Sequence, residues 1–459
     1  MIMLSEIAKA VGGQMLGVDV LCESVGSDSR NIVKNQLFVA LKGERFDGDS
    51  YAQEAIKQGA AAALVSDCNT QARPAVVVQD TRLALGAFAK FWREKFKIPL
   101  VAVTGSNGKT TVKEMITAIL MQTKKSVLAT QGNLNNDIGL PLTLLKLRKQ
   151  HEFAVIEMGM NHLGEIDYLT RISKPTVAVI TNAGTAHIGE VGSLENIAKA
   201  KGEIFAGLDE NGIAVINADD KYGDYWMSLN ENHHINTFGF NLADDVGASF
   251  EEKNDGCQVH LNTREGTVDF KLNMLGKHNV TNALAASAVA AALGLSNAEI
   301  AGGLSNFSGV KGRLQRKNGL NGAALIDDTY NANPDSMKAA IEVLAKQAGK
   351  KIFVMGDMAE LGTDSAQMHA EIGAYAKQKG VEILLTMGEY CVHTARAFGK
   401  NATHYASLQA LLNAASGLMK KDATVLVKGS RFMQMERVVA ALEEKHTEKQ
   451  MMQKMVEEK

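Results

Sequence analysis

Apolar, β-rich segments that alternate with helical segments constrain this chain more than any other feature. The first series has apolar segments at 98–103, 153–158, 177–181 and 213–217. The second has them at 323–326, 351–355, 383–387 and 424–427. Strands that are apolar throughout and separated by helices are typical of parallel sheets covered on both faces. We therefore predict a central parallel sheet with helices on both faces, followed by a doubly wound, Rossmann-like unit.

The rest of the chain has weaker patterns. Strands at 37–41, 62–66 and 75–79 are expected around a helix at 51–59. Alternating polar and apolar residues at 246–275 predict antiparallel strands at the edge of the central sheet, before an Ala-rich helix at 280–292. A length of 459 residues corresponds to about three domains. The sequence thus predicts a small α/β N-terminal domain at 1–96, a central domain at 97–310 and a C-terminal domain at 311–459.

Composition excludes several classes of protein. The net charge is −2, so the chain lacks the excess of basic residues that is typical of nucleic-acid-binding proteins. The four cysteines lack CxxC spacing, which indicates reduced thiols rather than disulfides or zinc. The start of the chain is not patterned as a signal peptide, and no apolar run approaches the ~20 residues that cross a bilayer. We expect a cytoplasmic monomer without a membrane span, whose charged end at 443–459 is a frayed helical extension.

The segment TGSNGKTT at 104–111 lies between an apolar strand and an amphipathic helix expected at 110–122. Glycines there let backbone N–H groups face a phosphate, and the helix N-terminus and Lys109 add positive charge. The hydroxyl of Thr110 can ligate Mg²⁺. The general phosphate-loop pattern has an earlier glycine where this chain has Val103. The segment predicts a nucleotide phosphate site, but does not choose between motor, switch, kinase and ligase.

Groups suited to metal binding follow two later strands, at the edge where ligands of parallel sheets bind. Glu157 ends the strand at 153–158, and His187 follows the strand at 177–181. An exposed acid and a surface histidine are the ordinary alternatives. Lys201, in a helix expected at 194–208, reads by itself as a solvated charge.

Several motifs together identify a family. They are the turn at 104–110, GNLNNDIGLP at 132–141, His187 followed by glycine and serine at 192–193, and KHNVTNA at 277–283. Along essentially its whole length the chain resembles the Mur ligases, the ATP-dependent amide ligases of peptidoglycan precursor synthesis. The shortened phosphate turn is this family's own form. The segments DDTYNANP at 327–334, GDMAELG at 356–362 and VKGSR at 427–431 resemble members that join D-alanyl-D-alanine to UDP-N-acetylmuramoyl-tripeptide.

The resemblance implies roles for individual residues. Lys109 would neutralise the phosphates. Thr110 and Glu157 would hold a first Mg²⁺ ion, and His187 a second. Lys201 aligns with a lysine that is carbamylated in related ligases, and the carbamate anion would orient Mg²⁺. The implied ATP-binding residues are Gly105, Ser106, Asn107, Gly108, Lys109, Thr110, Thr111, Asn279, Asn282, Arg313, Asp328, Tyr330 and Asn331. The implied substrate-binding residues are Ser29, Arg30, Lys42, Gly43, Phe46, Asn133, Asn135, Asn136, Lys428, Ser430 and Arg431. Asp49 stands where relatives often have histidine, so it receives no role.

The resemblance implies a reaction through an acyl phosphate, with the nucleotide-sugar, ATP and the incoming amine assigned to successive domains. Other readings stay open. One is a different ligase of this architecture, such as the diamino-acid-adding enzyme or a folylpolyglutamate synthase. Another is a non-catalytic nucleotide-binding switch. For Asn279 and Asn282, helix capping is the alternative to adenine contact.

Overall fold

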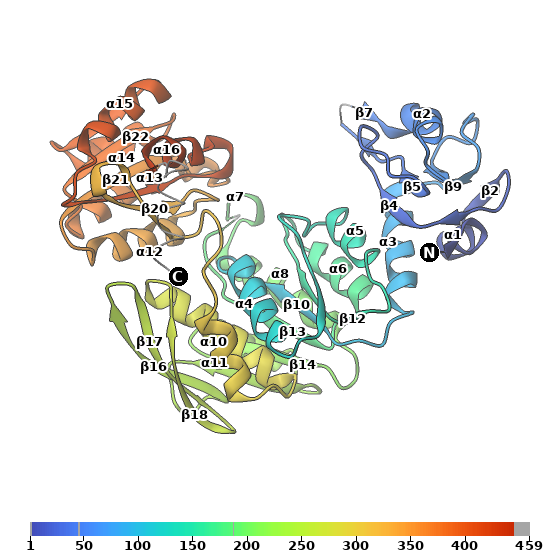
Figure 1. The fold of residues 1–459 in the computed structure, drawn as a ribbon, viewed down its shortest axis with the longest axis horizontal. Coiled ribbons are helices and arrows are strands. Elements are labelled where there is room, and N and C mark those ends of the chain that lie inside the picture. Colours follow the sequence, from blue (N-terminus) through green and yellow to red (C-terminus); the bar gives the residue numbers. More distant parts are fainter. Residues whose placement is uncertain (1, 45, 187, 445–459) are drawn as a thin grey trace, which may run out of the picture.

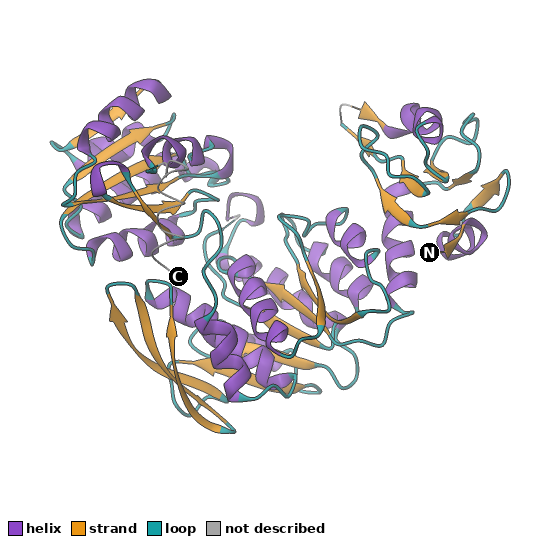
Figure 2. Cartoon of the chain, viewed as in Figure 1, coloured by secondary structure: helices purple, strands orange, loops and turns teal. Residues whose placement is uncertain are grey.

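The computed structural model describes residues 2–44, 46–186 and 188–444, and these form three large sheets in succession along the chain (Figure 1). Helices cover the central and C-terminal sheets on both faces (Figure 2). The predicted α/β fold with three domains is confirmed. The boundaries proposed for those domains stay predictions.

The N-terminal sheet is mixed and short-stranded. Its strands lie in the order β2 (Gln14–Leu16), β9 (Ala75–Val77), β8 (Ala62–Val65), β5 (Gln36–Val39) and β4 (Ser24–Gly26). Only the β2–β9 pair is antiparallel. Around it lie α1 (Leu4–Val11), α2 (Ala52–Lys57), the pair β1 (Ile2–Met3) and β3 (Leu21–Cys22), and the pair β6 (Lys42–Gly43) and β7 (Phe46–Asp47).

The central sheet has nine strands. Their order is β11 (Ser126–Ala129), β12 (His151–Glu157), β10 (Leu100–Thr104), β13 (Val177–Ile180), β14 (Ile213–Asn217), β15 (His234–Gly239), β16 (Val246–Lys253), β17 (Gly256–Thr263) and β18 (Gly266–Leu272). The pairs from β11 to β16 are parallel, and β16–β17–β18 are antiparallel, which confirms the predicted edge.

Helices pack on both faces of this sheet. One face is covered by α4 (Lys109–Gln122), α10 (Lys277–Ala292) and α11 (Asn297–Ser305). The other is covered by α5 (Gly139–Leu144), α6 (Glu165–Ser173) and α8 (Leu194–Gly202). The helix expected at 194–208 is interrupted: α8 ends at Gly202 and continues as a 3₁₀ segment, Glu203–Gly207. Short helices α7 (Ile188–Val191) and α9 (Gly223–Ser228) lie in connections.

The C-terminal sheet has the order β19 (Gln315–Asn318), β20 (Ala324–Asp328), β24 (Ala423–Lys428), β21 (Lys350–Gly356), β22 (Ile383–Met387) and β23 (Ala402–Tyr405). Only β19 runs antiparallel to its neighbour. One face packs against α12 (Pro334–Ala345), α13 (Ser365–Gln378) and α14 (Cys391–Phe398). The other packs against α15 (Leu408–Leu418) and α16 (Glu436–Leu442). The tail expected at 443–459 lies outside the described residues from 445 onward.

Helix α3 (Thr81–Arg93) joins the first two sheets. The Trp92 indole donates to the Leu147 carbonyl (3.2 Å), and the Arg93 guanidinium donates to the Ser173 carbonyl (3.0 Å). A single hydrophobic cluster contains Leu37 of the N-terminal sheet together with Leu85 of α3 and residues of α5 and α6. The first two domains therefore share a core. No helix within the described ranges is long and apolar enough to cross a membrane.

Candidate active site

The phosphate turn folds as predicted between β10 and α4. Gly105 and Gly108 have φ angles of 146° and 82°, a region that favours glycine. A Cβ at Gly105 would lie 1.9 Å from the Thr181 hydroxyl, and one at Gly108 would lie 2.2 Å from the Asn282 side-chain oxygen. Both glycines are thus required by backbone conformation and by close packing.

We expect Gly108→Ala to weaken ADP binding at least ~10-fold, because the methyl group adds a clash to a strained φ. Isothermal titration calorimetry with ADP measures this change. Gly294→Ala is a matched control: its φ is 77°, but nothing lies within 4 Å of the added carbon. Equal ADP affinity in the two variants would contradict the role given to the turn.

Lys109 begins α4 and is half-buried. Its Nζ donates to the Gly105 carbonyl (2.5 Å) and the Ser106 carbonyl (3.2 Å), so the side chain folds back over the turn. Burial lowers the pKa of Lys109, and the Glu157 carboxylate partly offsets that effect. The cation therefore already lies over the loop that the sequence assigned to phosphate.

Glu157 is the last residue of β12 and is buried. Its Oε1 accepts from the Asn135 amide (2.8 Å), whereas its Oε2 has no hydrogen-bond partner among the described residues. A buried, half-satisfied carboxylate beside a phosphate loop suits a hard cation with oxygen ligands. The alternative reading of Glu157, as an exposed strand-end acid, is therefore wrong.

Lys201 is completely buried near the end of α8, and its amine has no hydrogen-bond partner in the described structure. Burial, with the charge of Lys109 as the second cause, holds the pKa of the Lys201 amine well below its ordinary range. The reading of Lys201 as a solvated helical charge is therefore wrong. The partner predicted for this metal site, His187, lies outside the described residues.

The C-terminal domain reaches the same region. The Arg313 guanidinium donates to the Thr110 hydroxyl (3.0 Å) and lies 4.2 Å from the centre of the Tyr330 ring. Asp328 is paired with Lys428 (2.6 Å), whose amine also donates to the Asn331 carbonyl (2.9 Å). The structure thus brings together these predicted nucleotide residues, and it gives Lys428 a partner within the protein.

Asn279 and Asn282 lie buried in the first turns of α10, beside the phosphate turn. The Asn279 amide donates to the Leu275 carbonyl (2.8 Å), and the Asn282 amide donates to the Asn279 side-chain oxygen (3.3 Å). Gly276, not an asparagine, is the N-cap of this helix. The contact of these amides with adenine stays a prediction.

The predicted substrate residues of the N-terminal domain are not brought to the phosphate turn by any contact in the described structure. Arg30 is exposed and paired with Asp28 (2.9 Å), and Phe46 is 57% exposed. In Figure 1 this domain and the C-terminal domain lie on opposite sides of the central domain. Of the three predicted loop asparagines, Asn135 contacts Glu157, while Asn133 and Asn136 are exposed. Asp49 accepts from the Ser66 N–H (3.0 Å), a structural role.

Sequence reasoning missed two further contacts between the domains. Asn333 donates to the Asn107 side-chain oxygen (2.8 Å), and Asp335 accepts from Thr185. It also missed a cavity of about 400 Å³ at the carboxyl ends of the C-terminal strands, which Tyr390, among others, lines. The other lining residues are Asp357, Met358, Ala359, Glu360, Leu361, Gly362, Ser365, Gly388, Glu389, Phe432 and Met433.

Two residues predicted to bind substrate flank that cavity without lining it. The Ser430 hydroxyl is buried and donates to the Asp357 carbonyl (2.5 Å). Arg431 is exposed and paired with Glu436 (3.0 Å). The positions of the strands in the sequence predict neither the cavity nor these contacts. Both are formed by loops that are distant in sequence and come together only in the folded chain.

Comparison with known proteins decides the family. Three family models match in chain order: the Mur ligase family catalytic domain at residues 22–93, the Mur ligase middle domain at 103–290 and the Mur ligase glutamate ligase domain at 312–431. The chain belongs to the Mur ligase family. Among its curated relatives is the UDP-N-acetylmuramoyl-tripeptide–D-alanyl-D-alanine ligase of Escherichia coli (strain K12), 42% identical over 97% of this chain and 99% of the relative.

Solved Mur ligases have the same fold as this chain. A crystal structure of MurF from Acinetobacter baumannii aligns with a TM-score of 0.89 at 37% identity, covering 95% of this chain and 97% of that one. A MurF ligase from Thermotoga maritima in complex with ADP aligns with a TM-score of 0.83 at 29% identity, covering 92% and 97%. This Mur ligase therefore has all three domains of its relatives.

Proposed function

We propose that this Mur ligase uses ATP to join D-alanyl-D-alanine to UDP-N-acetylmuramoyl-tripeptide, in the cytoplasmic synthesis of peptidoglycan precursor. The observation that carries the proposal is the full-length match, at 42% identity, to a ligase named for those two substrates. We assign the nucleotide-sugar to residues 1–96, ATP to 97–310, and the incoming amine with part of ATP to 311–459. We infer that the enzyme acts as a monomer.

The residues present fit magnesium. Thr110 and Glu157 offer oxygen ligands on neighbouring elements, and one buried oxygen of Glu157 lacks a protein partner in the described structure. Magnesium held there would offset the negative charge of the phosphates as a carboxylate approaches them. His187 would serve a second ion.

The Lys201 amine has no hydrogen-bond partner among the residues that the structure describes, and this supports carbamylation. Its lowered pKa favours the neutral form of the amine, which is the form that attacks CO₂. A bond forms between Nζ and the carbon of CO₂, and one proton leaves to water. The resulting carbamate would be an anion within electrostatic reach of Lys109, whose charge is the second cause of the lowered pKa.

The reaction would proceed in two steps. The terminal carboxylate of the tripeptide attacks the γ-phosphorus of ATP, so that an acyl phosphate forms and ADP leaves. The amine of D-alanyl-D-alanine then attacks the acyl carbon, and the tetrahedral intermediate expels phosphate. Lys109 would stabilise the charge that develops on the transferred phosphoryl group. Arg313, bridging Thr110 and Tyr330, would hold the nucleotide from the other domain.

The dipeptide would bind in the 400 Å³ cavity that Tyr390 and Phe432 line. That cavity lies next to the central domain: at its edge, the Gly189 N–H of the central domain donates to the Glu360 carbonyl (3.2 Å). Ser430 and Arg431, which were predicted to bind substrate, would then act by fixing the loop between β24 and the cavity. The uridine end would contact the exposed residues around Arg30 and Phe46.

Phosphate release from ATP tests the function against its rivals. The purified chain is assayed with each acceptor (UDP-muramoyl-tripeptide, the dipeptide precursor or a folate) and each amine (D-alanyl-D-alanine, a diamino acid or glutamate). We expect turnover only when the tripeptide and D-alanyl-D-alanine are both present. Turnover with another pair would assign a different ligase, and hydrolysis that depends on neither substrate would indicate a switch.

A further inference from the structure

Helix α12 (Pro334–Ala345) contacts the central domain at both of its ends, about 18 Å apart at 1.5 Å per residue. We propose that Asp335, in its first turn, is a positioning residue that holds the loop at 184–185 against the phosphate turn when the C-terminal domain is closed. Asp335 would act through Thr185 and not on a substrate. A kinetic test of this inference, described below, rests on the proposed function. A second test, by X-ray scattering, does not.

The contact is specific to one carboxylate oxygen. Oδ2 of Asp335 accepts from the Thr185 N–H (2.6 Å) and from the Thr185 hydroxyl (2.8 Å). A Cβ at the preceding Gly184 would lie 2.7 Å from the same oxygen, so glycine permits this approach. Hydrogen bonds to an ionised acceptor are roughly twice as strong as neutral ones.

The loop held by Asp335 is itself bonded to the phosphate turn. The Ser106 hydroxyl donates to the Gly184 carbonyl (3.0 Å), and Asn333, the N-cap of α12, donates to the Asn107 side chain (2.8 Å). Two residues at the N-terminal end of α12 therefore contact the phosphate turn: Asn333 directly, and Asp335 through the loop that contains Thr185. Thr185 also stands two residues before His187, the predicted metal ligand outside the described residues.

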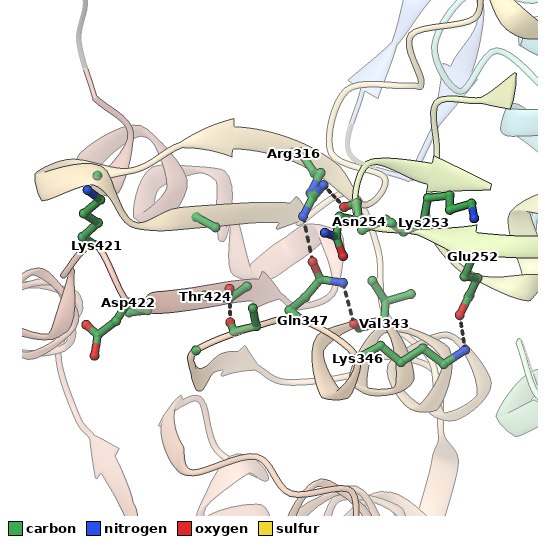
Figure 3. A pocket seen from close by; sticks show the side chains of 17 residues that line it. Glu252, Lys253, Asn254, Arg316, Val343, Lys346, Gln347, Lys421, Asp422 and Thr424 are labelled. Carbon is green, nitrogen blue, oxygen red and sulfur yellow. Dashed lines mark hydrogen bonds and ion pairs between the residues drawn. The ribbon is translucent and has the colours of Figure 1, made fainter. Parts of the chain in front are cut away.

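The other end of α12 supplies a matched control. There Lys346 pairs with Glu252 in the β16–β17 hairpin, and Arg316 joins the Asn254 carbonyl to the Gln347 side chain (Figure 3). These residues line a cavity of about 520 Å³ between the same two domains. The pair involves an exposed lysine, so its contribution is small. Glu252 and Asp335 are thus carboxylates bridging the same domains, but of the two only Asp335 touches the loop beside the phosphate turn.

The test compares Asp335→Ala, Asp335→Asn, Thr185→Val and Glu252→Ala. We expect Asp335→Ala to lower kcat ~10-fold with less than ~2-fold change in KM for ATP, because closure follows nucleotide binding. Asp335→Asn keeps an acceptor oxygen and should retain kcat within ~3-fold. Thr185→Val keeps the N–H bond and should lose only ~3-fold, and the Asp335→Ala/Thr185→Val double variant should be no worse than Asp335→Ala. Glu252→Ala should equal the unsubstituted chain.

Small-angle X-ray scattering with saturating ADP, far below the melting temperature, is the structural test. The radius of gyration of Asp335→Ala should stay larger than that of the unsubstituted chain and of Glu252→Ala. Equal radii, additive losses in the double variant, or a rise in KM with unchanged kcat would each overturn the inference. If the unsubstituted chain fails to ligate but Asp335→Ala still alters the radius, the proposed function fails and the positioning contact stands.

Discussion

Lys109→Ala is expected to lower ligation at least ~10³-fold while the folded structure survives, because a full positive charge is lost where the phosphoryl group develops charge. Lys109 is the first residue of α4, and its amine lies over the glycine turn. Alanine is a good helix former, so α4 should begin normally. Coupled ADP release gives the rate, and circular dichroism gives the fold and melting temperature.

Lys199→Ala is the matched control for this variant. Lys199 is also helical, but it is exposed, so its removal should change the rate by less than ~2-fold. Near-normal turnover of Lys109→Ala, or equal losses in the two variants, would remove the phosphate turn from the mechanism. Loss of the melting transition would instead show that Lys109 supports the fold.

Lys201→Ala is expected to lose at least ~10²-fold in rate, with partial recovery when acetate or another small carboxylic acid is added. The reason is the buried space left by the side chain, where a carboxylate can take the place of the carbamate. Labelled ¹³CO₂ should give a carbamate signal by NMR in the unsubstituted chain and none in the variant. A fully active alanine variant would contradict carbamylation, and an inactive variant without rescue would leave Lys201 with a packing role.

The lowered pKa of Lys201 predicts how the free energy of unfolding changes with pH in CO₂-free buffer. The folded chain holds this amine neutral at pH values where the unfolded chain protonates it, so the unfolded state binds more protons. The free energy of unfolding therefore rises with pH until the unfolded value of about 10.4. Lys201→Met should flatten that rise and be at least as stable at neutral pH. A steeper rise in the variant would contradict the neutral amine.

The fold could be predicted from the sequence where runs of apolar residues identify the strands. Strands β10, β12, β13 and β14 each contain an apolar run of four residues, at 100–103, 153–156, 177–180 and 213–216, so their positions could be predicted. The polar strand β15, with histidine and asparagine among its residues, gave no such signal. It forms because neighbouring strands supply its hydrogen bonds, which local pattern does not show.

The phosphate turn could be predicted because Gly105 and Lys109 belong to one contiguous motif, and their contact with ATP stays a prediction. Burial was not predictable for Lys201, because a lysine on a helix looks the same in sequence whether it faces water or the core. Asp335 was missed because its partner Thr185 is 150 residues away. Lys428 was predicted to meet substrate, but its pairing with Asp328 depends on two parallel strands lying side by side.

The shared core around α3 has a consequence for how the molecule unfolds. Leu37, Leu85 and Leu144 belong to one buried cluster, although the sequence places them in different domains. Cutting the chain near residue 96 would leave the faces of α5 and α6 that pack on α3 open to water. The first two domains should therefore melt as one cooperative unit, and the C-terminal domain, with separate clusters, as another. Heating should therefore separate the C-terminal domain from the first two domains, at the junction where the proposed closure takes place.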